Sequence, residues 1–159
     1  MEHNNCLICE RISMIKEGVN PYFVAELETG YVVIGDYQYF KGYTLFLCKQ
    51  HKTELHFLDE AFKIKFLTEM STVAEAVHTA FNADKINYEL LGNGDSHIHW
   101  HLFPRKVNDS PVKGPVWLVG VDKLLSDEVR PSEAELIEMK TKLYNELNKI
   151  TPIINKGDF

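Results

Sequence analysis

The chain has 159 residues, of which 45% are hydrophobic and 25% charged, a composition typical of a water-soluble globular protein with a core of its own. The formal net charge of −6 argues against a general nucleic-acid binder, because such proteins usually carry a basic stripe. The N-terminus lacks the basic and apolar regions of a signal peptide, and no apolar run approaches the roughly 18 residues of a membrane span, so a soluble cytoplasmic protein is expected.

The first part of the chain predicts a short helix followed by three strands. Residues 6–17 read as a helix that ends at Gly18. Residues 23–27 and 31–34 are rich in β-branched and aromatic side chains and flank a turn, and residues 43–48 have the same character. These segments therefore predict a sheet that begins early in the chain.

The strongest helical pattern lies between residues 59 and 81. Apolar side chains recur there every three or four positions, which predicts one apolar stripe along an amphipathic helix. Asp59 is the expected N-cap and Asn82 the expected stop. Two further strands, at 86–91 and 97–103, are predicted to form a hairpin around the intervening glycines.

The C-terminal third predicts a long loop and a second amphipathic helix. Three prolines between residues 106 and 131 favour a loop, which we expect to pack Trp117. Ser132 and Glu135 match a capping box, and the helix after them continues to Ile150. The tail from 151 to 159 is expected to be loose or to dock on a partner. The order of strands and helices predicts an α+β domain with a largely antiparallel sheet.

The chain has three cysteines, which is an odd number, and its sequence shows no secretion signal. That count argues against a disulfide framework and leaves metal binding open. Cys6 and Cys9 form a CxxC motif at the start of the first predicted helix, where positions i and i+3 share a face and both thiolates can point at one ion. The alternative is two small, semi-buried cysteines without a metal.

The stretch from 97 to 103 carries the most chemical information. His97, His99 and His101 alternate with apolar residues, so on a strand the three imidazoles share one face. A polar strand face, a catalytic metal site and nucleophilic catalysis all remain open on this pattern. Spacing weakens a three-histidine metal site, because the outer pair on a strand lies roughly 13 Å apart.

These segments resemble the histidine triad (HIT) family of nucleotide hydrolases and transferases. Residues 97–103 fit its His-Φ-His-Φ-His-Φ-Φ signature, where Φ is apolar. Residues 42–51 resemble the upstream Gly-His-Thr-Leu-Val-Ile-Pro-Lys-x-His strand, and Asn93-Gly94 the segment before the triad. The resemblance covers roughly residues 5–106 of a single domain spanning 1–159.

The resemblance implies a HIT-like α+β fold, an antiparallel sheet of about five strands with a main helix, to which this chain adds a loop and C-terminal helix at 107–150. It implies that His99 is the nucleophile of a nucleotidyl-histidine intermediate, with its Nδ1 hydrogen donated to a backbone carbonyl. His101 is expected near the leaving group, and His97 completes the triad. Dinucleoside polyphosphates or nucleoside phosphoramidates are the implied substrates, and a nucleoside monophosphate the product.

Bacterial HIT proteins with an N-terminal CxxC resemble this chain in a further respect. Their zinc ligands correspond to Cys6, Cys9, His51 and His97, all of which are present, so the resemblance implies a structural zinc ion. A homodimer is implied as well. Two rival functions stay open: a nucleotide-binding or adaptor protein with little turnover, and a zinc hydrolase that uses the histidines as ligands of a catalytic ion.

The chain departs from the family pattern at three places. Tyr43 stands where the family often has a further histidine. The ribose-binding acid of the family aligns with Gly35, and Asp36 follows it, either as the displaced ribose ligand or as a turn residue. The loop before the triad is shorter than in many family members. Within it, Asn93 and Ser96 are candidate phosphate contacts, and the alternative is that both are plain turn residues.

The remaining polar residues carry weaker expectations. Arg105 either contacts phosphate or forms a surface salt bridge. His3, His56 and His78 follow no partner pattern and are expected on the surface.

Overall fold

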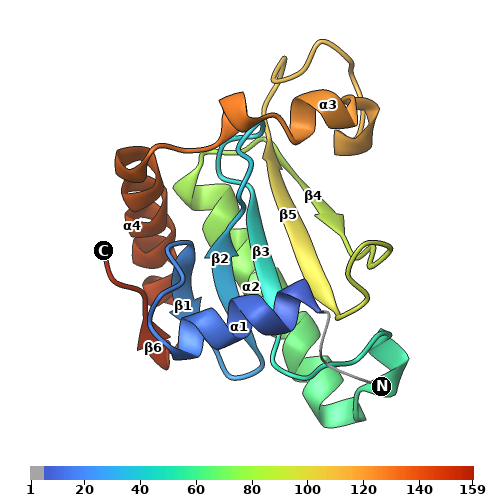
Figure 1. Ribbon diagram of the computed structural model, residues 1–159, viewed down its shortest axis with the longest axis vertical. Coiled ribbons are helices and arrows are strands. Elements are labelled where there is room, and N and C mark those ends of the chain that lie inside the picture. The colour runs from blue at the N-terminus through green and yellow to red at the C-terminus, as the bar shows by residue number, and fades with distance from the viewer. Residues whose placement is uncertain (1–5) are drawn as a thin grey trace.

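A computed structural model describes residues 6–159 as a six-stranded sheet between two helical layers (Figure 1). His3 lies outside the described residues. The strand order is β4-β5-β3-β2-β1-β6, and every neighbouring pair is antiparallel. The elements in chain order are α1 (Leu7–Lys16), β1 (Phe23–Glu26), β2 (Gly30–Ile34), β3 (Thr44–Cys48), α2 (Glu60–Ala80), β4 (Lys85–Glu89), β5 (His99–Arg105), α3 (Val121–Leu124), α4 (Glu133–Ile150) and β6 (Asn155–Lys156).

The helices begin or end at the capping residues and the glycine that the sequence predicted. The carboxylate of Asp59 accepts a hydrogen bond from the amide of Phe62 at the start of α2. Ser132 and Glu135 form the predicted reciprocal capping box at the start of α4. Gly18 follows α1 with a φ of +73°, a left-handed conformation that favours glycine. Both predicted amphipathic helices are confirmed.

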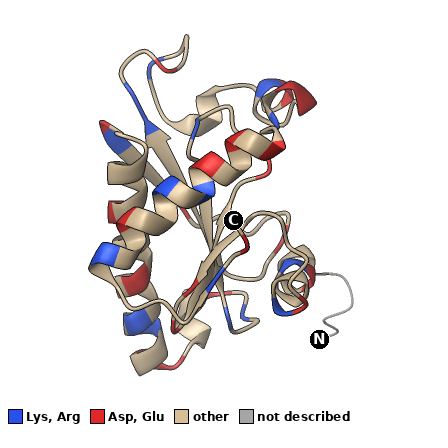
Figure 2. Cartoon of the chain, turned by 90° about the vertical axis from the view of Figure 1, so that its left-hand side faces the viewer, with Lys and Arg blue, Asp and Glu red and all other residues tan. Residues whose placement is uncertain are grey.

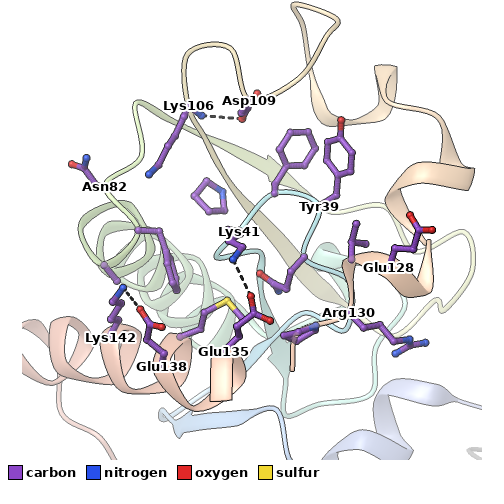
Figure 3. Close-up of a pocket in the computed structure, with 18 residues that line it drawn as sticks. Tyr39, Lys41, Asn82, Lys106, Asp109, Glu128, Arg130, Glu135, Glu138 and Lys142 are labelled. Carbon is purple, nitrogen blue, oxygen red and sulfur yellow. Dashed lines mark hydrogen bonds and ion pairs between the residues drawn. The ribbon is translucent and has the colours of Figure 1, made fainter. Parts of the chain in front are cut away.

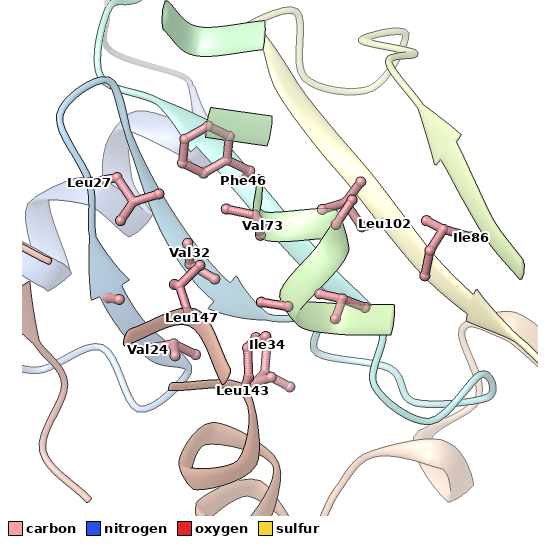
Figure 4. Close-up of a cluster of buried hydrophobic side chains, with 14 of the residues drawn as sticks. Val24, Leu27, Val32, Ile34, Phe46, Val73, Ile86, Leu102, Leu143 and Leu147 are labelled. Carbon is pink, nitrogen blue, oxygen red and sulfur yellow. The ribbon is translucent and has the colours of Figure 1, made fainter. Parts of the chain in front are cut away.

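Alternation along the strands gives the sheet two different faces. One face packs against α2 and α4 in the main core, which includes Val32, Phe46 and Leu102 from the sheet and Leu143 and Leu147 from α4 (Figure 4). The opposite face packs against α1 through a smaller apolar cluster. The register pairs Leu47 with His99 and Leu45 with His101, so the triad lies on the α1 face.

The C-terminal tail forms a strand, which corrects the expectation that it is loose or docks on a partner. Residues 155–156 pair with β1, and the amide of Gly157 donates to the carbonyl of Val24 at 3.0 Å. The ammonium group of Lys140 in α4 donates to the carbonyls of Pro21, at 2.8 Å, and Asp158, at 3.3 Å. The tail therefore docks on its own chain as the sixth strand.

The segment between β5 and α4 packs differently from the prediction. Trp117 was expected in the core of this loop, yet 66% of it is exposed. Its neighbours Val116 and Val119 are buried instead and pack against Phe40. A single 3-10 turn at Val116–Leu118 turns these two valines inward and the indole outward, which a loop prediction cannot specify.

Arg105 ties this segment to the sheet. Its guanidinium donates to both carboxylate oxygens of Asp109, at 2.8 and 2.9 Å, and also to Asn87 and to the carbonyl of Gly114. The ring of Phe40 lies under it, with its centroid 4.2 Å from the Arg105 Cζ. Only 8% of Arg105 is exposed, so the predicted salt bridge is present but buried. Its guanidinium is engaged by these partners within the fold and is not presented to a phosphate.

Replacing Arg105 by alanine is expected to lower the free energy of unfolding by about 2–4 kcal/mol, because Asp109 and Asn87 lose a buried, bidentate partner. Urea unfolding measures the change. The matched control is Arg130→Ala, which removes a pair with Asp127 whose side chains are 40% and 88% exposed, together with a contact to Tyr37. Exposed pairs contribute little to stability, so equal losses in the two variants would contradict the assignment.

The helical surface is mixed in charge. Figure 2 shows Lys and Arg interspersed with Asp and Glu along the helices on one side of the molecule. Within residues 6–159, no helix combines the length and the apolar character required to cross a lipid bilayer.

Candidate functional site

The cluster of Cys6, Cys9, His51 and His97 lies where the start of α1 meets the segment leading into β5. One ligand atom from each residue lies within 4.8 Å of every other. Cys9 Sγ is 3.2 Å from His51 Nδ1 and 3.4 Å from His97 Nδ1, and Cys6 Sγ is 3.6 Å from His97 Nδ1. Donors separated by about 90 residues in the sequence thus meet around one point.

This donor set fits a zinc ion. Zinc–nitrogen bonds of about 2.0 Å and zinc–sulfur bonds of about 2.3 Å at tetrahedral angles hold sulfur and nitrogen donors about 3.5 Å apart. The three sulfur–nitrogen distances, 3.2, 3.4 and 3.6 Å, bracket that value. Two thiolates and two imidazoles also form a closed set of the kind that serves structural rather than catalytic zinc.

His97 is oriented for ligation through Nδ1. Its Nε2 lies 2.8 Å from the carbonyl oxygen of Cys48. Because a carbonyl only accepts, Nε2 carries the hydrogen and the lone pair is on Nδ1, facing the two thiols. His97 precedes β5, which begins at His99, so the first histidine leaves the strand to join the cluster while the other two stay on it.

His99 has the orientation expected of a nucleophile. Its Nδ1 lies 2.6 Å from the carbonyl oxygen of His97, and 6% of the residue is exposed. The carbonyl accepts, so Nδ1 carries the hydrogen, and in the neutral ring the lone pair is on Nε2. Among the described residues, the metal-type cluster includes His97 but not His99, whose Nδ1 faces a carbonyl instead, so the cluster is not a site shared by His97 and His99.

His101 pairs with Tyr43. The phenol oxygen lies 2.6 Å from His101 Nδ1, and the Tyr43 ring stacks on Phe103 with centroids 4.1 Å apart. Burial, with the charges of Asp36 and Glu89, raises the pKa of Tyr43 far above its ordinary range. Burial and the neighbouring His99 lower the pKa of His101 to about 4. Both partners are therefore neutral at neutral pH.

The His101 pKa predicts acid sensitivity. The groups that face it are His99, Tyr43 and Glu89, the last opposite it in the β4 register. Unfolded histidine binds a proton below about 6.5, whereas folded His101 does so only at about 4. The unfolded state therefore binds more protons in this window, and the free energy of unfolding falls as the pH falls through it.

Between pH 6.5 and 4, the free energy of unfolding of His101→Gln is expected to fall by about 1–3 kcal/mol less than that of the unaltered protein. Urea unfolding at several pH values in that window measures the difference, and acid effects common to both proteins cancel. Parallel pH profiles would contradict the assignment.

An apolar pocket lies beside the triad. It has a volume of ≈ 170 Å³ and is walled by α1 on one side and by the α1 face of the sheet on the other. Asp36, for which a displaced ribose ligand and a turn residue were both open, is one of the residues that line it. The Nη2 of Arg11 lies 2.6 Å from the Asp36 carboxylate, so a ribose would share this acid with an arginine. The lining residues also include Ile8, Tyr22, Val33, Tyr43, Leu45, Leu47 and Leu125.

The other predicted substrate contacts lie elsewhere. Asn93 and Ser96 are exposed, and neither lines the apolar pocket. In the turn before the triad, Gly92 has the left-handed backbone conformation, with a φ of +78°, and Asn93 does not. His56 and His78 are exposed, as predicted.

Sequence reasoning missed Arg11 and Leu125 as pocket residues. Arg11 lies four positions after Leu7 on the face of α1 that turns toward the pocket, so helical spacing alone carried the signal. Leu125 is the residue directly after α3, in a segment whose sequence predicts only a loop, and it carried no such signal.

A larger hollow of ≈ 580 Å³ lies between the end of α2 and the start of α4 and contains none of the predicted site residues (Figure 3). Its rim charges are largely paired, Lys41 with Glu135 at 3.1 Å and Lys142 with Glu138 at 2.6 Å. The smaller pocket adjoins the triad and is therefore the stronger candidate.

These features place the protein in a class whose sheet presents alternating histidines beside an apolar pocket. Comparison with known proteins identifies the family. The model of the HIT domain family matches residues 23–108, and the chain belongs to that family. A search of curated proteins found no match.

Solved structures of histidine triad proteins share this fold. One from Bradyrhizobium japonicum is 24% identical, with a TM-score of 0.68 over 85% of this chain and 95% of that one. A hypothetical histidine triad nucleotide-binding protein from Sulfolobus tokodaii is 18% identical, with a TM-score of 0.66 over 91% of this chain and 93% of that one. A zinc-bound histidine triad family protein from Mycobacterium smegmatis is 21% identical, with a TM-score of 0.62 over 92% and 95%.

Proposed function

We propose that this protein is a nucleotide hydrolase that acts through a nucleotidyl-histidine intermediate on His99 and releases a nucleoside monophosphate. The observation that carries the proposal is the hydrogen bond from His99 Nδ1 to the carbonyl of His97, because it places the lone pair of the neutral ring on Nε2. The apolar pocket beside the triad supplies a surface for the nucleoside.

In the proposed reaction, the Nε2 lone pair of His99 forms a bond to the α-phosphorus. The bond from phosphorus to the leaving atom breaks, and its electron pair goes to that atom. A water oxygen then forms a bond to the phosphorus and gives up one proton to solvent, the bond to His99 Nε2 breaks with its electron pair returning to the nitrogen, and the monophosphate departs. Dinucleoside polyphosphates and nucleoside phosphoramidates both fit this chemistry, since each places a leaving group on an α-phosphorus.

We further propose that Cys6, Cys9, His51 and His97 hold a structural zinc ion. The ion would supply a fixed point joining the start of α1 to the entry of β5, and the four residues leave His99 free. In this scheme the zinc has no contact with the phosphate. The zinc-bound relative from Mycobacterium smegmatis supports the proposal, as does the donor geometry.

The test is capture of the intermediate. The protein is incubated with an adenosine phosphoramidate and, separately, with diadenosine tetraphosphate, and is quenched in acid-free denaturant before intact-mass analysis. A nucleotidyl adduct on the protein and release of AMP are the expected results. Absence of both with either substrate would contradict the proposal.

A nucleotide-binding or adaptor role with little turnover is the second candidate. It is favoured by the exposed positions of Asn93 and Ser96 away from the pocket and by the engagement of Asp36 with Arg11. Calorimetric binding of AMP without hydrolysis of any nucleotide conjugate would select it. The homodimer and the cytoplasmic location implied by the sequence stay predictions.

A further inference from the structure

Tyr43 and His101 form a pair that the resemblance does not supply. The family pattern often has a histidine at position 43, next to the nucleophile, whereas the Tyr43 hydroxyl lies 2.6 Å from Nδ1 of His101. The phenol ring is held in place, because it stacks on Phe103 with centroids 4.1 Å apart and planes 5° from parallel. The hydroxyl is therefore directed at the third triad histidine.

The direction of this hydrogen bond follows from the chemistry of the two groups. A phenol is a better donor than acceptor, and among residues 6–159 the Tyr43 hydroxyl has no hydrogen-bond partner other than His101. If Nδ1 of His101 carried the hydrogen, the phenolic hydrogen would have no protein acceptor among the described residues, which is unfavourable for a buried group. Tyr43 thus donates, and the single hydrogen of neutral His101 is on Nε2.

Gly35 makes room for the tyrosine ring. A Cβ atom at position 35 would lie 2.2 Å from Tyr43 Cδ1 and 2.4 Å from Cε1, which is closer than real Cβ contacts. The amide of Gly35 also donates to the carbonyl of Tyr43 at 2.8 Å. Any side chain at position 35 would therefore displace the ring or the strand.

Gln38 locks the loop that joins these two residues. Its side-chain amide donates to the carbonyls of Gly35, at 2.8 Å, and Tyr43, at 2.9 Å, and its carbonyl oxygen accepts from the amide of Gly42 at 2.8 Å. Gln38 is 6% exposed. The loop is consequently a fixed support for the Tyr43 ring.

We propose that Tyr43 is a positioning residue that holds His101 in the tautomer with hydrogen on Nε2, and that Gly35 is the paired departure that makes room for it. The proposal assigns a role within the proposed hydrolase reaction and rests on that function. It joins two separate departures from the family pattern, the missing acid at 35 and the missing histidine at 43, in one structural unit.

The consequence is a fixed hydrogen-bond donor at the leaving group. The His99 and His101 rings have centroids 4.6 Å apart, so a phosphorus attacked by His99 brings its leaving atom near His101. As the bond to that atom breaks, the atom receives the electron pair, and His101 Nε2–H stabilises the developing charge. The hydrogen stays on His101, and a leaving group that requires a proton takes it from water.

Without the Tyr43 hydroxyl, neutral His101 would divide between two tautomers, and the donor would be present only part of the time. The effect should grow with the charge that the leaving atom bears. A series of AMP aryl esters tests this, because their phenols differ in pKa and little in shape.

Tyr43→Phe keeps the ring and its stacking. We expect its turnover of the ester with the least acidic phenol to fall about 10-fold, and turnover of the nitrophenyl ester to change less than about 2-fold. Tyr88→Phe is the matched control, since it removes a hydroxyl from a residue that is 48% exposed. An equal loss across the whole ester series in Tyr43→Phe would overturn the proposal.

The pairing with Gly35 has its own prediction. Introduced alone, Gly35→Ala should make turnover depend more steeply on the pKa of the leaving phenol, because the methyl group displaces the Tyr43 ring. The same substitution in the Tyr43→Phe background should leave that dependence unchanged. Additive effects would mean that Gly35 acts independently of the hydroxyl.

The tautomer itself can be observed by ¹⁵N NMR of the histidine rings, which does not require activity. We expect an unprotonated Nδ1 and a protonated Nε2 for His101 in the unaltered protein, and averaged shifts in Tyr43→Phe. A protonated Nδ1, or shifts that do not change, would overturn the proposal. If the unaltered protein hydrolyses none of the esters, the proposed function fails, and the NMR result alone decides the role of Tyr43.

Discussion

His99→Ala is expected to lower turnover of any nucleotide substrate by about 10⁴-fold or more and to abolish the covalent adduct. The physical reason is that the side chain supplies the electron pair that forms the new bond to phosphorus. A water molecule that attacked phosphorus in its place would lack the orientation that His99 receives from the hydrogen bond between its Nδ1 and the His97 carbonyl. Steady-state kinetics and intact-mass analysis measure the two effects.

Two controls separate this loss from damage to the fold. His56→Ala and His78→Ala remove exposed histidines and should leave turnover within about 2-fold. His99→Ala should also retain a cooperative thermal transition and any bound metal, because His99 is not among the four clustered residues. Rapid turnover by a folded His99→Ala protein would contradict covalent catalysis at this residue.

The sequence predicted those parts of the fold that depend on local pattern. The stripe along α2 and the capping box of α4 are encoded within a few residues, and the structure has both. The alternation of histidines predicted their common face in the same way, since side chains on a strand point to opposite sides in turn. His97 departs from this only by leaving the strand before His99.

The parts that the sequence did not predict depend on contacts between distant residues. The strand at 155–156 has too few residues for a periodic signal and is held by β1 and by Lys140 of α4. The pair of Arg11 and Asp36 joins residues 25 positions apart. The clash that a side chain at Gly35 would make with Tyr43 likewise appears only once the loop has folded.

Cys9→Ala is expected to abolish the zinc binding proposed for this site and to lower the melting temperature by about 10 °C or more. Cys9 Sγ is close to both His51 and His97, so its removal opens the donor set. A ligand present at about 1,000 times its dissociation constant stabilises the folded state by about 4 kcal/mol. In a chain of this size each kcal/mol shifts the melting temperature by about 2–4 °C. Elemental analysis and calorimetry measure the metal and the transition.

Cys48→Ala is the matched control. Cys48 is fully buried, and only its backbone carbonyl contacts the cluster, through His97 Nε2. The alanine variant keeps that carbonyl, so it should retain zinc and lose only the packing of one sulfur atom. Loss of metal in both variants, or in neither, would contradict the assignment of the ligands.

The destabilisation of Cys9→Ala should be local before it is global. Cys6 and Cys9 stand at the start of α1, and the far end of that helix packs on the sheet through Ile12 and Ile15. Loss of the metal should therefore speed amide hydrogen exchange in α1 more than in α4, which packs in the main core. Because α1 forms one wall of the apolar pocket, the same variant should bind AMP more weakly. Unchanged exchange in α1 with the zinc removed would mean that packing alone fixes this wall.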